Sequence, residues 1–129
     1  MNGKVVVSSP NAPAAVGPYS PAIKQGKMVF LSGQIAIDPA TGKLKGPGIA
    51  EQTEQAIRNV EALLDVCQLS LASVVKTTIY LKSMDDFAAM NAAYAKHFIF
   101  EPPARSTVEV SRLPMNALVE IDAIAVIAD

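Results

Sequence analysis

Two residues stand out as candidates for chemistry, Arg105 and Glu120, because each lies in a stretch that otherwise has the pattern of a core strand. From Arg105 to Ser111 polar and apolar residues mostly alternate, which is the period of a half-buried strand. In the run 118–127 one face is fully apolar, while the other carries Glu120 and Asp122. A buried carboxylate is costly unless it is paired or used. Glu120 is therefore either a rim position at the solvated end of a sheet or a functional carboxylate, whereas Asp122 is interpreted mainly as structural.

Two other segments place polar side chains where proline or glycine interrupts regular backbone structure. Four prolines between residues 9 and 21 exclude a helix interior and a central strand, so this segment is predicted to be an extended surface loop. It is either a connector that covers strands or a stiff frame that presents the Tyr19 ring and hydroxyl at low entropic cost. Gly33, inside the strand predicted over 28–37, marks a bulge or a place where a backbone or ligand comes close, with Ser32 beside it.

Apolar spacing predicts two helices. The first spans 49–67, where apolar residues recur at intervals of three and four and charged residues occupy the other side. The second follows Ser83, which fits a capping box with Asp86, and runs to about Phe98. Its apolar stripe contains one amide, Asn91, which needs hydrogen-bond partners if it is buried.

The predicted elements form the order strand, strand, helix, strand, helix, strand, strand, which indicates an α+β fold with a mixed sheet and two helices. The predicted strands cover 4–8, 28–37 with 22–27 leading into it, 73–81, 105–111 and 118–127. Two helices can cover only one face of a sheet, yet 74–81 and 118–127 carry apolar side chains on both faces. The second face is therefore predicted to be buried against copies of the chain, most simply in a closed ring.

Length and composition indicate one globular domain over residues 1–129, half hydrophobic and 18% charged. A net charge of −1 gives no overall field to attract nucleic acid. The single cysteine, Cys67, cannot form an internal disulfide, and no signal peptide or transmembrane run is evident, so a cytoplasmic location is predicted. His97 is the only histidine and has no cysteine nearby, so no metal site is predicted.

Several motifs together resemble the YjgF/YER057c/UK114 family, the RidA enamine and imine deaminases. The similarity runs nearly end to end and in the same order: Gly-Pro-Tyr-Ser at 17–20, Ser-Gly-Gln at 32–34, Val-Val-Lys-Thr-Thr at 74–78, Asp86-Phe87 with Asn91 and Tyr94, Pro-Ala-Arg-Ser at 103–106 and Glu-Ile-Asp-Ala-Ile-Ala at 120–125. The resemblance implies a chorismate-mutase-like α+β fold and a homotrimer with a central β-barrel and clefts between subunits. It also implies hydrolysis of 2-aminoacrylate and 2-iminobutyrate to 2-keto acids and ammonia without a cofactor.

The chemistry of the candidate residues suits this reaction. Arg105 offers a planar fork that binds a substrate carboxylate bidentately. Glu120 can orient a water molecule, take its proton as it adds to the C=N carbon, and pass a proton to the leaving nitrogen. The resemblance implies binding and positioning roles for Tyr19, Ser32, Gly33, Asn91 and Thr107. Two positions depart from the pattern, since many relatives have cysteine where Thr107 stands and glutamine where Pro21 stands.

One geometric problem and two other functions stay open. If the last two strands form a simple hairpin, Glu120 lies opposite about Val110, and Arg105 is about five residues or roughly 17 Å away. Either the pairing is different or the site is assembled from two chains, and we favour a composite cleft.

One alternative function is a keto acid-binding regulatory module that keeps Arg105 and does not need Glu120. Another is a ribonuclease or translation inhibitor, against which the acidic charge, few aromatics and lack of a histidine pair argue.

Overall fold

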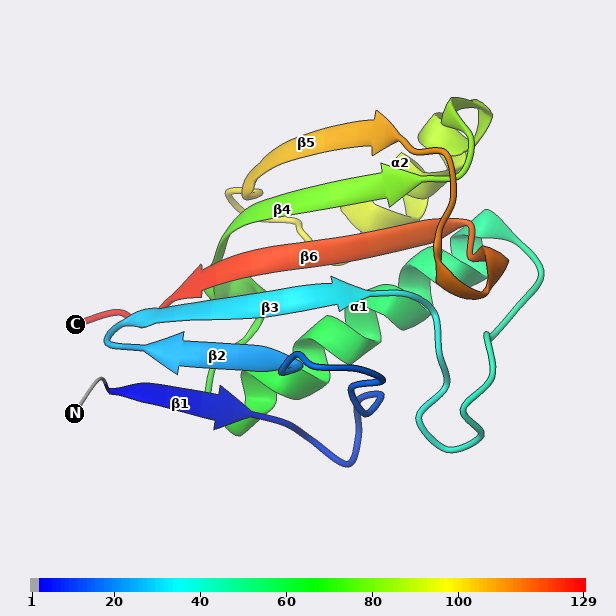
Figure 1. The fold of residues 1–129 in the computed structure, drawn as a ribbon. Coiled ribbons are helices and arrows are strands. Elements are labelled where there is room, and N and C mark those ends of the chain that lie inside the picture. The colour runs from blue at the N-terminus through cyan, green and yellow to red at the C-terminus, as the bar shows by residue number, and fades with distance from the viewer. Residues whose placement is uncertain (1–2) are drawn as a thin grey trace.

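A computed structural model describes residues 3–129 as a mixed six-stranded sheet with two α-helices (Figure 1). The sheet order is β1-β2-β3-β6-β4-β5, and only the β4–β5 pair is parallel. This confirms the predicted α+β class. The elements are β1 (Lys4–Val7), β2 (Ala22–Gln25), β3 (Met28–Gln34), α1 (Ile49–Val66), η1 (Leu71–Ser73), β4 (Val74–Leu81), η2 (Met84–Asp86), α2 (Phe87–Ala95), β5 (Ala104–Glu109), η3 (Pro114–Asn116) and β6 (Val119–Val126), where η marks a 3-10 turn.

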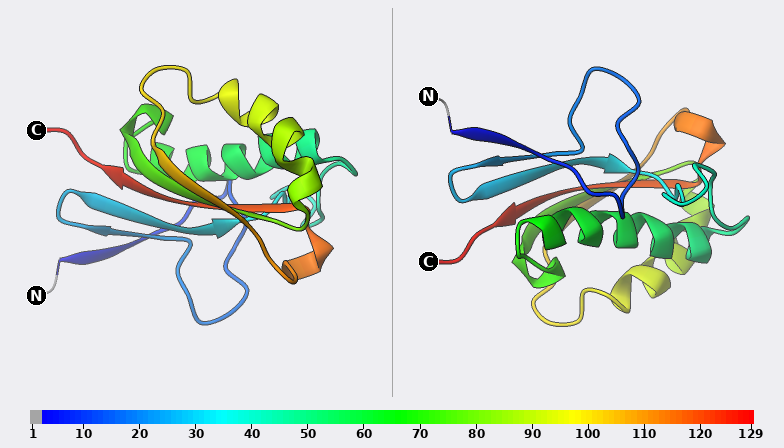
Figure 2. Two further views of the ribbon diagram at one scale, coloured as in Figure 1. Left: turned by 90° about the horizontal axis from the view of Figure 1, so that it is seen from above. Right: turned by 90° about the horizontal axis from the view of Figure 1, so that it is seen from below.

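Both helices pack on the same face of the sheet, as predicted (Figure 2). The apolar stripe of α1 supplies fully buried residues such as Ile57, Leu63 and Leu64. They meet the alternate residues of β6, of which Val119 and Ile121 are also buried. Full burial of one such aliphatic side chain contributes about 1.5–3 kcal/mol, so this interface is the core that fixes the strand faces. No helix within residues 3–129 combines the length and apolar character needed to cross a bilayer.

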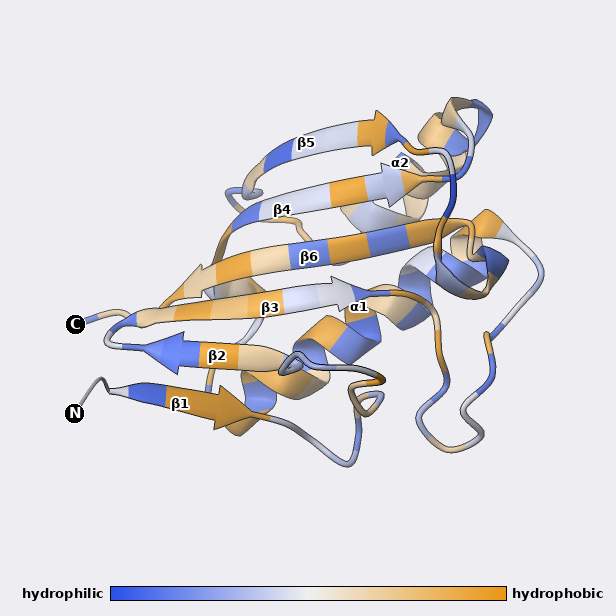
Figure 3. Ribbon diagram, in the orientation of Figure 1, coloured by the Kyte–Doolittle hydropathy of each residue, from blue (hydrophilic) through white to orange (hydrophobic). Residues whose placement is uncertain are grey.

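Neither α-helix lies on the opposite face of the sheet, and the loop 8–21 projects from that side (Figure 2). Residues paired in register share a face, so Phe30 and Ile124 lie here together. Several large apolar side chains on this open face are exposed, including Val6 at 61% and Phe30 at 41%. Figure 3 shows many apolar residues along β1, β3 and β6, counting the residues of both faces of each strand. Self-association through this face stays a prediction.

The structure corrects three local predictions. Residues 22–34 form a β2–β3 hairpin that turns at Gly26, which has a φ of 59°, instead of one lead-in and one strand. Simple alternation in 74–81 predicts that Val75 shares the face of Thr77 and Ile79, but a register shift between Val74 and Lys76 breaks it, so Val74 is buried and Val75 is 48% exposed. The Ser83 hydroxyl caps η2 by accepting from the Asp85 N–H at 3.1 Å, and α2 already ends at Ala95.

The last two strands are not a hairpin, because β4 lies between β5 and β6. β5 runs parallel to β4 and forms one edge of the sheet, whereas β6 is antiparallel to both β4 and β3. The hairpin distance estimated from the sequence therefore does not apply. The separation of Arg105 and Glu120 must instead be worked out through β4.

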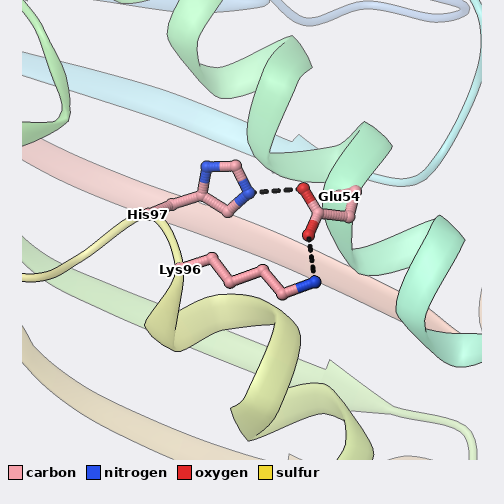
Figure 4. A network of polar contacts seen from close by, with 3 residues as sticks. All are labelled: Glu54, Lys96 and His97. Atoms are coloured by element: carbon pink, nitrogen blue, oxygen red, sulfur yellow. Dashed lines mark hydrogen bonds and ion pairs between the residues drawn. The ribbon is translucent and has the colours of Figure 1, made fainter.

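The C-terminal end of α2 is tied to α1 by a polar contact (Figure 4). The His97 ring and the Lys96 ammonium group both contact the carboxylate of Glu54 on α1. The same part of α2 is held to the sheet by a hydrogen bond of 2.8 Å between the Tyr94 and Thr77 hydroxyls. These contacts fix α2 over β4 and β5, which is where Arg105 lies.

Candidate functional site

The carboxyl group of Glu120 lies against Gly33. A Cβ atom added to Gly33 would stand only 2.7 Å from the Glu120 carboxyl carbon and 2.9 Å from its Cγ, closer than real Cβ atoms come to other heavy atoms. The register shift between Leu31 and Gln34 carries Gly33 to this position. The predicted bulge and the predicted close approach are thus both present, and the group that approaches is the candidate acid.

Glu120 faces a cavity of about 310 Å³ at the end of the open face. It is the only charged side chain among the described residues that line the cavity, whose walls are mostly apolar. Burial among these walls raises the pKa of the Glu120 carboxyl group, and the negative charge of Asp122 raises it further. The lining residues are Pro13, Ala14, Ala15, Val16, Tyr19, Pro21, Gly33, Gln34, Ile35, Ile37, Pro114, Met115 and Glu120.

The proline-rich loop supplies one wall of this cavity and is bound to the end of β3. The Tyr19 ring lines the cavity and is half exposed, and its hydroxyl accepts a hydrogen bond of 3.3 Å from the Val16 N–H. The Ser32 hydroxyl donates to the Ser20 carbonyl at 2.7 Å, and the Ser32 N–H donates to the Pro21 carbonyl at 2.9 Å. Ser32 therefore holds the loop that presents Tyr19. A proline at 21 keeps the carbonyl that this contact needs.

Arg105 lies on the edge strand β5, under α2. Its guanidinium carbon is 4.9 Å from the centre of the Tyr94 ring and 5.8 Å from that of Phe87, within the range of cation–π attraction. Within residues 3–129, the guanidinium group has no carboxylate at ion-pair distance and donates no hydrogen bond. Because these contacts are with aromatic rings, the N–H groups of the half-buried guanidinium group stay available to bind an anion.

Two polar atoms near Arg105 are buried without a partner among the described residues, Asn91 Oδ1 and Thr107 Oγ1. Asn91 lies one helical turn from both Phe87 and Tyr94, whose rings face the Arg105 guanidinium group, and Thr107 is two positions from Arg105 on the same face of β5. A buried polar atom that lacks a hydrogen bond costs about 1–3 kcal/mol. This cluster is therefore equipped to receive a polar ligand.

One chain does not bring Arg105 and Glu120 together. Arg105 is opposite Thr77 on β4 and Glu120 is opposite Tyr80, so they are three positions and two strands apart, about 14 Å. They also face opposite ways, since Thr77 is buried beneath the helices. The predicted site residues thus form two groups. The open-face group is Glu120, Gly33, Ser32 and Tyr19, and the edge group is Arg105, Asn91 and Thr107.

Sequence reasoning missed most of the cavity wall. Residues 13–16 and 35–37 are small or apolar and carry no chemical signal of their own. Met115 and Asn116 have left-handed φ values of 55° and 57°. The residue type agrees with the turn predicted at Asn116, but it does not predict this conformation for Met115. Phe87 and Tyr94, whose rings face Arg105, belong to the apolar stripe predicted for the second helix. Their contact with Arg105 could not be predicted, because it depends on the pairing of β5 with β4.

Comparisons with known proteins agree on one family. Residues 9–127 match the family model described as Endoribonuclease L-PSP. A RutC family protein of Pyrococcus horikoshii is 51% identical over 122 residues, which cover 95% of this chain and 97% of the relative. The chloroplastic Reactive Intermediate Deaminase A of Arabidopsis thaliana is 48% identical, with 95% of this chain and 65% of the relative covered. The crystal structure of E. coli TdcF with bound serine superposes with a TM-score of 0.89 at 37% identity, covering 96% of this chain and 99% of that chain.

Proposed function

Because this chain belongs to the Endoribonuclease L-PSP family, the YjgF and RidA proteins, we propose that it hydrolyses short 2-enamino and 2-imino acids to 2-keto acids and ammonia. The substrates in this proposal are 2-aminoacrylate and 2-iminobutyrate, which give pyruvate and 2-oxobutyrate. The observation that carries it is the Glu120 carboxyl group, placed against Gly33 in an apolar cavity that raises its pKa. Such a carboxyl group is a stronger base than an exposed one and can also return the proton.

The reaction needs an anchor for the substrate carboxylate, a water molecule and one acid–base group. In our proposal Arg105 binds the carboxylate, Asn91 Oδ1 accepts a hydrogen bond from the imine N–H or the water, and the Thr107 hydroxyl donates or accepts one there. Glu120 takes a proton from the water as the water oxygen bonds to the C=N carbon, and it passes this proton to the nitrogen. The hydroxyl proton of the resulting carbinolamine is then transferred by Glu120 to the nitrogen, which leaves as ammonia while the C=O bond forms. All atoms come from the substrate and one water molecule.

The proposed site lies between two chains of a homotrimer. One chain supplies Arg105, Asn91 and Thr107, and its neighbour supplies Glu120, Gly33, Ser32 and Tyr19. Support comes from the opposite faces of Arg105 and Glu120 within one chain, from the position of Arg105 on an edge strand, and from the exposed apolar side chains of the open face. The serine bound to TdcF, a small molecule with one carboxylate, is a ligand of the size that this proposal requires.

Two alternatives have less support. A binding module for keto acids would need Arg105, but it gives no reason for a desolvated acid beside Gly33. The family description names an endoribonuclease, but the single histidine contacts Glu54 on the helix side of the sheet, where α1 meets α2. His97 is therefore placed to hold the helices together, and a deaminase is the better fit.

The proposal is tested by measuring the release of 2-oxobutyrate and ammonia from freshly generated 2-iminobutyrate, with and without the protein. We expect Arg105→Ala to abolish turnover. Glu120→Gln should lower kcat by about 10²–10⁴-fold and bind 2-oxobutyrate as the wild type does. The matched control is Glu61→Gln, which removes an exposed carboxylate from α1 on the other side of the molecule. Wild-type kcat in Glu120→Gln would exclude Glu120 as the acid–base group, whereas no turnover by the wild-type protein would favour the binding module.

A further inference from the structure

A second acid lies beside Glu120 and is held in place. Glu120 and Asp122 are two positions apart on β6 and face the same side of the sheet. In the β4–β6 register Tyr80 is opposite Glu120, and Thr78 is opposite Asp122. The Tyr80 hydroxyl reaches across this register and donates a hydrogen bond of 2.9 Å to Asp122 Oδ2. The charge of Asp122 is therefore fixed next to the candidate acid–base residue.

This second charge is not neutralised within residues 3–129. Lys76 is the cation on the same face of β4, but its ammonium group donates to the Thr77 carbonyl at 3.4 Å and to the Thr78 hydroxyl at 3.3 Å. The other elements around Glu120 contribute Tyr19 from the loop, and uncharged residues from β3 and η3. A carboxylate with a purely structural role in a strand would be expected to have a cation partner, because two like charges on one half-buried face repel each other.

We propose that Tyr80 and Asp122 are positioning residues for the deamination: Tyr80 holds the Asp122 carboxylate beside Glu120, so that Glu120 acts as an effective base towards water. The proposal rests on the function proposed above and adds two residues to it. Two mechanisms act together. The negative charge of Asp122 stabilises the protonated form of Glu120, which also appears as the second cause of its raised pKa. The tyrosine hydrogen bond holds the Asp122 carboxylate in place and so fixes its distance from Glu120.

The size of the effect follows from the geometry. Two strand positions separate the carboxylates by about 7 Å. At the effective dielectric constant of a partly exposed site, removing one charge at this distance shifts a titration midpoint by about half a unit or more. Asp122→Asn keeps an oxygen that accepts the Tyr80 hydrogen bond, so it removes the charge and retains the fold. Tyr80→Phe removes only the hydroxyl that holds Asp122.

The experiment is a ¹³C NMR titration of the Glu120 carboxyl group in the free protein, combined with the pH dependence of kcat/KM for 2-iminobutyrate. Asp122→Asn should lower the Glu120 midpoint by about half a unit or more and move the acid limb of kcat/KM by the same amount. Tyr80→Phe should produce a smaller shift of the same sign, because the Asp122 carboxylate is then no longer held close to Glu120. Asp122→Glu should restore the wild-type limb, and Glu61→Gln should change neither readout.

The possible failures are distinguishable. An unchanged Glu120 midpoint in Asp122→Asn overturns the proposal, even if turnover falls, because a loss of folding or packing lowers turnover without moving a midpoint. An unchanged midpoint in Tyr80→Phe overturns the role of Tyr80. If the wild-type protein hydrolyses no imine, the deaminase itself is refuted. The NMR titration would still show whether the two carboxyl groups are coupled.

Discussion

Replacing Gly33 by alanine tests whether the position of the Glu120 carboxyl group matters for turnover. The added Cβ would lie 2.7 Å from the Glu120 carboxyl carbon, whereas non-bonded carbon atoms normally approach to about 3.5–4.0 Å. The carboxyl group must therefore move by about 1 Å. A displacement of this size in a reacting group costs about 10²-fold in rate. The backbone at Gly33 is not left-handed, so alanine adds no backbone strain, and the flexible end of Glu120 can move aside, so the melting temperature should change little.

The assay for Gly33→Ala is kcat for 2-iminobutyrate, together with the dissociation constant of 2-oxobutyrate, which should change little. A second substitution, Glu120→Asp, shortens the acid by one methylene and should recover part of the lost rate in the Gly33→Ala background. Gly42→Ala is the matched control. Its φ of 75° makes alanine destabilising, yet no atom lies within 4 Å of the added Cβ, so kcat should be retained. Wild-type kcat in Gly33→Ala would refute the reasoning about Glu120.

Three further outcomes are expected. Thr107→Val removes the unpaired buried hydroxyl, so the protein should gain about 1 kcal/mol of unfolding free energy while binding of 2-oxobutyrate weakens; unchanged binding would exclude Thr107 from the site. Tyr94→Leu removes the ring that faces the Arg105 guanidinium group and should raise KM about 2–5-fold. Tyr94→Phe keeps the ring and loses only the hydrogen bond to Thr77, so it should lower stability but leave KM unchanged. Equal KM values in the two variants would show that the ring does not help to position Arg105. Protonated Glu120 cannot accept a proton from water, so kcat/KM should fall as the pH drops through the raised pKa of Glu120. The midpoint of this acid limb should lie above the usual glutamate pKa of about 4.3. A midpoint at or below that value would count against Glu120 as the base.

Much of the fold follows from local patterns. The spacing of apolar residues in α1 predicted its bounds to within a residue, because an amphipathic helix must turn one stripe to the core. The faces of β6 were predicted from simple alternation, and Val119 and Ile121 are buried while Glu120 faces the open side. Gly33 was predicted as a bulge or a close approach, since these are the usual roles of a glycine within a strand.

What could not be predicted depends on contacts between distant segments. The insertion of β4 between β5 and β6 is a choice of strand pairing that no local pattern records, and it decides that Arg105 and Glu120 lie on opposite faces. The register shift between Val74 and Lys76 likewise buries Val74 and exposes Val75, the opposite of what simple alternation along the strand predicts. Asp122 was interpreted as structural because its partner, Tyr80, is 42 positions away in the chain.

The most direct test of the account is complementation between two inactive variants, Arg105→Ala and Glu120→Gln. Each chain of a mixed trimer would lose only one half of the proposed site, so some sites would combine an intact Arg105 from one chain with an intact Glu120 from its neighbour. With random assembly after co-expression in equal amounts, about one quarter of the sites would be complete. We therefore predict that the mixture regains about a quarter of wild-type turnover of 2-iminobutyrate, although each variant alone has almost none. If the mixed protein stays as inactive as its components, Arg105 and Glu120 do not meet across two chains, and the composite site is wrong.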